Sequence, residues 1–231
     1  MTRMLKASLA YQALSFLALT GCASRSVKPT EPKAKAPDMS AVTSLSGRFS
    51  LGHSCVIAPR QMLTAAHVID PRPWDATVPL VPMVWSDARG HGGIASPVWV
   101  KRDRDLGLLT PVEGEPDFPV VLPVAQAPPV AGDKAWILGY EYRSKSKALQ
   151  ERLFETRVLR VFSRMIVIDQ DTLPGSSGGC VINDKGEAEG ILVWSFGLET
   201  GFKDSVGLAV LISGETFEEK PKELQEPAVE Q

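Results

Sequence analysis

The chain has 231 residues, which corresponds to one domain or two small ones and excludes a large multidomain machine. Apolar residues make up 44% and charged residues 23%, as in an ordinary globular protein that buries a core. The formal net charge is −2, so the chain lacks the excess of positive charge that is typical of nucleic-acid-binding proteins, and we expect no nucleic-acid partner.

The first segment, residues 1–21, is predicted to be an export signal. Basic Arg3 and Lys6 precede an apolar run that is too short to span a bilayer. The run ends in Leu19-Thr20-Gly21-Cys22, which resembles the bacterial lipobox, whose cysteine is lipidated and becomes the new N-terminus. This resemblance implies an exported protein anchored in the cell envelope through lipid on Cys22, with the outer membrane or cell surface favoured. Ordinary signal cleavage near Ala23 is the alternative.

Two further segments are predicted to lie outside the folded domain. Residues 22–40 contain three prolines and three lysines without apolar periodicity, and we interpret them as the lipidated cysteine and a flexible tether. Residues 215–231 contain six glutamates and two lysines and are interpreted as a solvated acidic tail. Residues 41–214 remain as the folded domain.

The body of the chain is predicted to be all-β. Its 19 glycines and 18 prolines leave little room for long helices, and no long window has helical periodicity. The expected strands, in chain order, are Cys55–Ala58, Val78–Trp85, Ala95–Val100, Lys134–Tyr140, Phe154–Val161, Met165–Asp169, Val181–Asn183, Gly190–Trp194 and Val206–Ile212. Six prolines between Pro111 and Val130 indicate a linker. The pattern therefore predicts two small barrels or sandwiches, at about 45–110 and 132–213.

Three local patterns contain candidate catalytic residues. They are Leu63-Thr64-Ala65-Ala66-His67-Val68, Asp103-Arg104-Asp105-Leu106-Gly107-Leu108-Leu109 and Pro174-Gly175-Ser176-Ser177-Gly178-Gly179-Cys180. A serine hydroxyl is a weak nucleophile and needs a base within hydrogen-bond reach, which in turn needs an orienting carboxylate. A glycine-rich turn can supply backbone donors for the oxyanion.

Chain order decides among the protease and hydrolase types that use these groups. The glycine-rich pattern alone also fits the nucleophile elbow of α/β-hydrolases, but those place their histidine after the serine, and none follows Ser177. The subtilisin order needs an aspartate before the histidine, and only Asp38 in the tether precedes His67. The order His…Asp…Ser remains.

The three motifs in this order resemble those of trypsin-like (chymotrypsin-fold) serine proteases over about residues 46–213. The resemblance implies two six-stranded antiparallel β-barrels with the active site between them. The segment that leads into the serine turn, Asp171-Thr172-Leu173-Pro174-Gly175, is similar to the same segment in bacterial glutamyl endopeptidases and HtrA-type proteases. Only 19 residues follow Ile212, so we expect no PDZ domain of the kind that HtrA-type proteins append.

The resemblance implies the catalytic roles. His67 is the expected base, Asp105 its orienting group and Ser177 the nucleophile, with the Gly175 and Ser177 amides as the oxyanion hole. Asp103 competes with Asp105, which is preferred because the following leucines are expected to bury it behind the imidazole. Ser176 competes with Ser177 and is disfavoured because the donor two residues before it would be Pro174, which has no N–H.

The substrate-binding residues are also implied by resemblance. Val193, Trp194 and Ser195 are expected to form the strand along which an extended peptide docks, although Trp194 could instead be a core aromatic. Asp171 and Thr172 are expected beside the primary pocket. Asp171 alone suggests cleavage after Arg or Lys. Leu192, which stands where the glutamyl branch has a histidine, argues against Glu and favours small or medium aliphatic residues.

The cysteines and remaining histidines have several interpretations. Once Cys22 carries lipid, Cys55 and Cys180 remain, and in the family fold their segments approach each other, which implies a disulfide; two buried free thiols are the alternative. A zinc site using His53, Cys55 and Cys180 has non-standard spacing, so no metal or organic cofactor is expected. His53 and His91 are interpreted as surface or loop histidines.

The resulting hypothesis is an envelope-anchored serine endopeptidase, expected to be monomeric, that acts on protein or peptide substrates. A protease-like surface lipoprotein that binds peptides or partners without turnover is the alternative from another class, and acyl-ester hydrolysis by the same residues stays open. Ser176 stands where trypsin has the aspartate that pairs with its freed N-terminus, so we expect no proteolytic activation.

Overall fold

The structure is a computed structural model that describes residues 36–47, 50–70, 80–142, 149–170, 173–196 and 206–217. The chain divides into two units, residues 1–33 and 34–231, and all described residues belong to the second. The predicted signal, Cys22 and most of the tether and acidic tail therefore lie outside the described residues. The ends of these two segments that the structure describes belong to the fold, because Ser40 is buried and Glu215 pairs with Arg104 (2.6 Å). Within the described part, no helix is long and apolar enough to cross a membrane.

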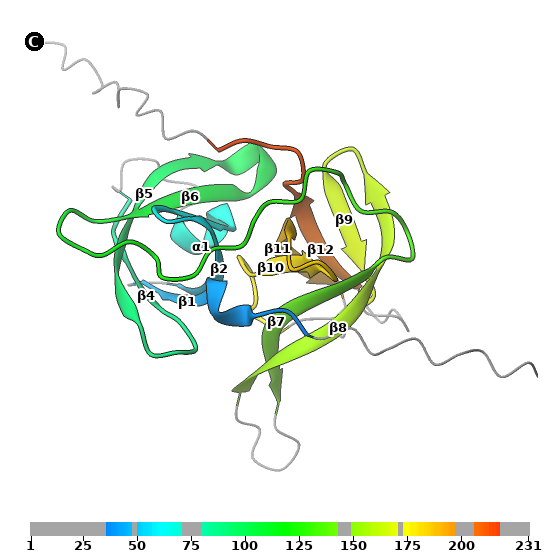
Figure 1. The fold of residues 1–231 in the computed structure, drawn as a ribbon, viewed down its shortest axis with the longest axis horizontal. Coiled ribbons are helices and arrows are strands. Elements are labelled where there is room, and N and C mark those ends of the chain that lie inside the picture. Colours follow the sequence, from blue (N-terminus) through cyan, green and yellow to red (C-terminus); the bar gives the residue numbers. More distant parts are fainter. Residues whose placement is uncertain are drawn as a thin grey trace, which may run out of the picture. The chain divides into compact units, whose positions relative to one another are not determined.

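The first half of the domain forms a closed antiparallel barrel of six strands in the order β1-β2-β3-β6-β5-β4 (Figure 1). The barrel is preceded by a 3-10 turn at Met39–Ala41. Its strands are β1 (Val42–Ser46), β2 (Leu51–Ala58), β3 (Gln61–Thr64), β4 (Met83–Ser86), β5 (Gly92–Lys101) and β6 (Leu106–Pro111). Two short helical elements interrupt it, α1 (Ala66–Ile69) after β3 and a 3-10 turn (Arg102–Arg104) before β6.

The second half repeats the architecture as a second closed antiparallel barrel, ordered β10-β11-β12-β9-β8-β7 (Figure 1). Its strands are β7 (Lys134–Tyr142), β8 (Leu149–Phe162), β9 (Met165–Ile168), β10 (Cys180–Asn183), β11 (Ala188–Phe196) and β12 (Val206–Leu211). The predicted all-β fold of two six-stranded antiparallel barrels is confirmed.

Side-chain alternation explains why these segments become strands. In β4, Met83 and Trp85 are buried in the first barrel while Val84 and Ser86 are exposed, the period-two pattern of a sheet with one face on a core. The strand expected from Val78 begins later, at Met83, and residues 80–82 are irregular. Pro82 lacks the N–H that a ladder requires, which accounts for the later start. Residues 71–79 lie outside the described part.

The proline-rich segment between the barrels packs across both of them. The amide of Phe118 donates to the Pro59 carbonyl and the amide of Leu122 donates to the Val56 carbonyl. The Phe118 ring lies edge-on to Trp85 with centroids 5.2 Å apart. Further along, Val124 forms a parallel bridge to Ala188 of the second barrel. The predicted linker is therefore packed against both barrels. The largest buried apolar cluster also contains residues from both barrels.

Candidate active site

His67 is presented by the short helix α1, and Asp105 meets it from the turn before β6. The His67 backbone N–H donates to Asp105 Oδ1 (2.9 Å), and its ring Nδ1 lies 2.7 Å from Asp105 Oδ2. A proton on Nδ1 satisfies the carboxylate and leaves Nε2 as the acceptor that a general base needs. The aspartate contacting His67 is thus Asp105 and not Asp103.

An unusual backbone conformation places the Asp105 carboxylate. Its φ of 50° is the one positive value among the described non-glycine residues, and its carbonyl accepts the amide of Ala66. Aspartate tolerates this left-handed conformation better than most residues. The side chains of Asp105 and His67 remain 31% and 48% exposed, so the expectation that leucines bury the aspartate is wrong. Leu106, Leu108 and Leu109 are buried in the barrel instead.

Ser177 lies on the turn between Pro174 and β10, directly against the first barrel. Its carbonyl accepts the backbone N–H of His53 at 2.8 Å. The next residue, Gly178, has a φ of 91°, and a Cβ there would collide with the His53 carbonyl and with Thr64 Oγ1. The glycine after the candidate nucleophile is therefore required both by conformation and by the contact between barrels.

The two predicted oxyanion amides belong to Gly175 and Ser177. Gly175 has a φ of 98°, and within the described residues neither its amide nor that of Ser177 donates to a protein acceptor. Ser176, by contrast, is completely buried, and its Oγ accepts the Tyr140 amide at 3.0 Å. This burial disfavours Ser176 as the nucleophile and gives it a role in holding the turn.

A cavity of about 370 Å³ brings the candidate groups together. Its lining consists of His67, Asp105, Leu173, Pro174, Ser177, Leu192, Val193 and Trp194. The Trp194 side chain is 63% exposed, so its interpretation as a core aromatic is wrong. Asp171 and Thr172 lie outside the described residues, and for Ser195 the structure describes the backbone, within β11, but not the side chain.

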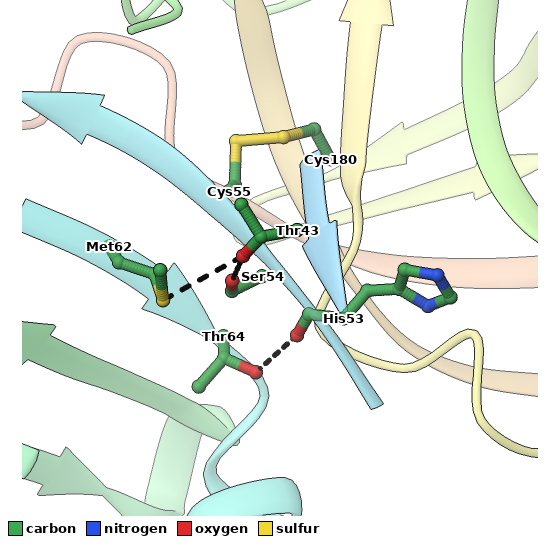
Figure 2. The surroundings of a disulfide bond; sticks show 7 residues. All are labelled: Thr43, His53, Ser54, Cys55, Met62, Thr64 and Cys180. Atoms are coloured by element: carbon green, nitrogen blue, oxygen red, sulfur yellow. Dashed lines mark hydrogen bonds between the residues drawn. A yellow bond between two sulfur atoms is a disulfide. The ribbon is translucent and has the colours of Figure 1, made fainter. Parts of the chain in front are cut away.

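Cys55 of β2 and Cys180 of β10 form a disulfide that joins the two barrels (Figure 2). Their Cα atoms lie 5.3 Å apart across a sequence separation of 125 residues. The predicted bridge is confirmed, and because it uses both sulfurs, it rules out the zinc site with His53. The described residues also contain no group of three or more His, Cys, Asp or Glu side chains placed to hold a metal ion.

His53 is the residue that sequence reasoning misjudged most. The sequence favours a surface or loop histidine, but His53 lies within β2 and is completely buried. Its Nδ1 lies 2.8 Å from the Gly175 carbonyl and its Nε2 lies 3.0 Å from Glu151 Oε1. Strand alternation offered a signal, because His53 is two residues from Cys55 and so shares its face toward the second barrel. His91, by contrast, is exposed as predicted.

Comparison with known proteins agrees with this architecture. The model of the trypsin-like peptidase domain family matches residues 52–191. A serine endoprotease from Yersinia pestis has a similar structure, with a TM-score of 0.56 and 22% identity over 75% of this chain and 59% of its own. Rv3671c from M. tuberculosis H37Rv, in a mutant, inactive form, gives a TM-score of 0.54 and 18% identity, covering 75% and 82% of the two chains.

These solved structures support the fold. The chain spans 59% of the length of the Yersinia pestis endoprotease. No curated protein matches the sequence. The family match covers more than half of the chain and includes His67, Asp105 and Ser177, and the chain therefore belongs to the trypsin-like peptidase domain family.

Proposed function

We propose that the protein is a serine endopeptidase in which Ser177, His67 and Asp105 form the catalytic triad. The observation that carries the proposal is that the His67–Asp105 pair and Ser177 line one cavity. The amides of Gly175 and Ser177 also donate to no protein acceptor among the described residues. If His67 had only a structural role and Ser177 only capped a turn, their placement around one cavity would not be expected.

The reaction follows from these positions. Ser177 Oγ attacks the peptide carbonyl carbon while His67 Nε2 accepts its proton, and Asp105 stabilises the resulting imidazolium through Nδ1–H. The amides of Gly175 and Ser177 bind the carbonyl oxygen as it becomes an oxyanion, each contributing about 10²–10³ in kcat. His67 then gives its proton to the leaving amine, and water hydrolyses the acyl-enzyme by the same route.

The turn that carries Gly175 and Ser177 is proposed to be active without proteolytic processing. Ser176 stands at its centre and is uncharged, and its buried Oγ accepts the Tyr140 amide. This local bond replaces any need for a charged N-terminus to insert beneath the turn. A full-length preparation that stays inert until it is clipped near residue 48 would contradict this.

The apolar lining favours small or medium aliphatic side chains before the cleaved bond. Leu173, Leu192 and Val193 are among the residues that line the cavity, so a substrate carboxylate placed against them would lose hydration without gaining a partner, at a cost of about 1–3 kcal/mol. The relation to glutamyl endopeptidases would then be one of ancestry and not of specificity. The peptide is proposed to lie along Val193–Ser195 as an added strand.

A positional peptide library tests this function, with Ser177→Ala as the inactive control and Ser176→Ala as the milder neighbouring variant. We expect cleavage after aliphatic residues that disappears in Ser177→Ala. Dominant cleavage after Arg or Lys that is lost in Asp171→Asn would contradict the pocket proposal, and dominant Glu would contradict it altogether. Hydrolysis of acyl esters without any peptide cleavage would show that the protein is an esterase and not an endopeptidase.

The location is proposed from the N-terminal sequence. Lipid on Cys22 would anchor a monomeric protease domain in the cell envelope through the predicted tether of residues 22–40, of which residues 22–35 lie outside the described residues. Several acyl chains on one residue give stable anchoring, at about 0.8 kcal/mol per buried methylene. Incorporation of a labelled fatty acid that is lost in Cys22→Ser would support this, and a soluble, unlabelled product cleaved at Ala23 would contradict it.

A further inference from the structure

Both ring nitrogens of buried His53 face hydrogen-bond acceptors. Nδ1 lies 2.8 Å from the Gly175 carbonyl oxygen, and Nε2 lies 3.0 Å from Glu151 Oε1. A carbonyl oxygen and a carboxylate can only accept, so both contacts are hydrogen bonds only when both nitrogens carry protons. In either neutral tautomer, one lone pair of a fully buried ring would face an acceptor, which is costly.

We propose that His53 and Glu151 are a positioning pair, in which the imidazolium of His53, paired with the carboxylate of Glu151, holds the Gly175 carbonyl and thereby the oxyanion turn. This rests on the proposed function, because the turn supplies the oxyanion amides. Gly175 has a φ of 98° and no Cβ, so its own backbone does little to fix its orientation. An external hydrogen bond to the Gly175 carbonyl fixes the orientation of this residue and so the direction of its own N–H, the proposed oxyanion donor.

The pair also connects the two barrels. His53 belongs to β2 and Ser44 to β1 of the first barrel, and Glu151 and Tyr140 belong to β8 and β7 of the second. Ser44 Oγ donates to Glu151 Oε1 at 2.8 Å, and the Tyr140 ring lies 5.0 Å from the His53 ring. The His53 backbone N–H adds a bond to the Ser177 carbonyl. One residue of the first barrel thus holds both the oxyanion glycine and the nucleophile serine.

The charges around the ring are consistent with an ion pair. Two titratable groups of the second barrel, Glu151 and Tyr140, contact the His53 ring. The oxyanion turn contacts it through the Gly175 carbonyl, and Ser44 of β1 bonds to Glu151. The hydrogen bond from His53 is the main cause that lowers the pKa of Glu151, against the effect of burial. Burial and the charge of Glu151 raise the pKa of Tyr140, which keeps its hydroxyl neutral. Glu151 is therefore an anion in direct contact with the buried ring.

Nuclear magnetic resonance of ¹⁵N-histidine-labelled full chain tests the pair directly. The protein has three histidines, and His67→Gln and His91→Gln variants assign their ring signals. We expect both His53 nitrogens of the wild type to carry protons, because each of them faces a hydrogen-bond acceptor. In Glu151→Gln we expect only one. A neutral His53 in the folded wild type would overturn the proposal, whether or not the enzyme cleaves peptides.

Kinetics test the positioning role. Glu151→Gln should lower kcat about ten- to hundredfold, less than removal of a full oxyanion donor, with KM changed by no more than about twofold. Glu155→Gln is the matched control, because Glu155 lies on the same strand and pairs with Lys134 (2.9 Å). Wild-type kcat in Glu151→Gln would overturn the role. A wild type without peptidase activity would refute the proposed function, while its spectrum still tests the pair.

Discussion

Replacing buried Glu189 with glutamine should stabilise the protein strongly at high pH and weakly at low pH. Glu189 lies on β11 with 4% of its surface exposed, and its Oε2 has no hydrogen-bond partner within the described structure. Burial, reinforced by the charges of Asp133, Glu187 and Asp184, raises the pKa of Glu189 from 4.5 to about 7. The folded protein therefore keeps a proton that the unfolded chain releases above pH 4.5.

The sign and size of the effect follow from proton linkage. Because the folded pKa is the higher one, stability falls as pH rises from about 4.5 to 7, by about 3 kcal/mol in total. Glutamine has nearly the same shape and no charge. Glu189→Gln should therefore raise the free energy of unfolding above that of the wild type by about 3 kcal/mol at pH 8 and about 1 kcal/mol at pH 5. Urea unfolding at the two pH values, with the disulfide intact, measures the difference.

The control is Glu113→Gln, at an exposed glutamate, which should change the unfolding free energy by a similar small amount at both pH values. Equal stabilities of wild type and Glu189→Gln at pH 8, or a difference that does not vary with pH, would refute the reasoning. The first result would mean that Glu189 finds a partner or solvent in the folded state.

Two further predictions concern the contact between the barrels. Replacing both cysteines of the Cys55–Cys180 bridge with serine should lower the unfolding free energy by about 4–5 kcal/mol, measured by urea unfolding; an unchanged midpoint would show that the bridge adds no stability. Gly178→Ala should abolish activity and destabilise the domain by more than about 3 kcal/mol, because its Cβ would meet the His53 carbonyl and Thr64 at a positive φ. Gly186→Ala is its control, since that glycine also has a positive φ but no atoms lie within 4 Å of the added Cβ; equal losses in the two variants would show that the contact is unimportant.

Much of the fold and the candidate site was predictable from local patterns. Alternating apolar residues and turn chemistry located most strands, and the order of His67, Asp105 and Ser177 selected one protease architecture. The disulfide was predictable only through the family resemblance, because nothing local pairs residues that are 125 positions apart. The later start of β4 follows from the missing N–H of Pro82 and was readable in principle.

What the sequence did not predict depends on contacts between distant segments. Glu151 is 98 residues from His53 and Gly175 is 122 residues from it, so no local pattern revealed that they meet. Glu189 follows Asn183-Asp184-Lys185-Gly186, a polar turn that suggests exposure. Its burial arises because the segment around Val124 and Ala125 pairs with Ala188. In both cases tertiary packing, and not residue type, decides the environment.

Labelling with a fluorophosphonate probe tests the central claim most directly, because the probe reacts with an activated serine and requires no knowledge of the substrate. The account predicts one adduct per chain, placed on Ser177 by peptide mass spectrometry, absent in Ser177→Ala and strongly slowed in His67→Ala. Labelling should persist in Ser176→Ala. An adduct on another serine, or a folded wild-type protein that does not react, would contradict the assignment of Ser177 as the nucleophile.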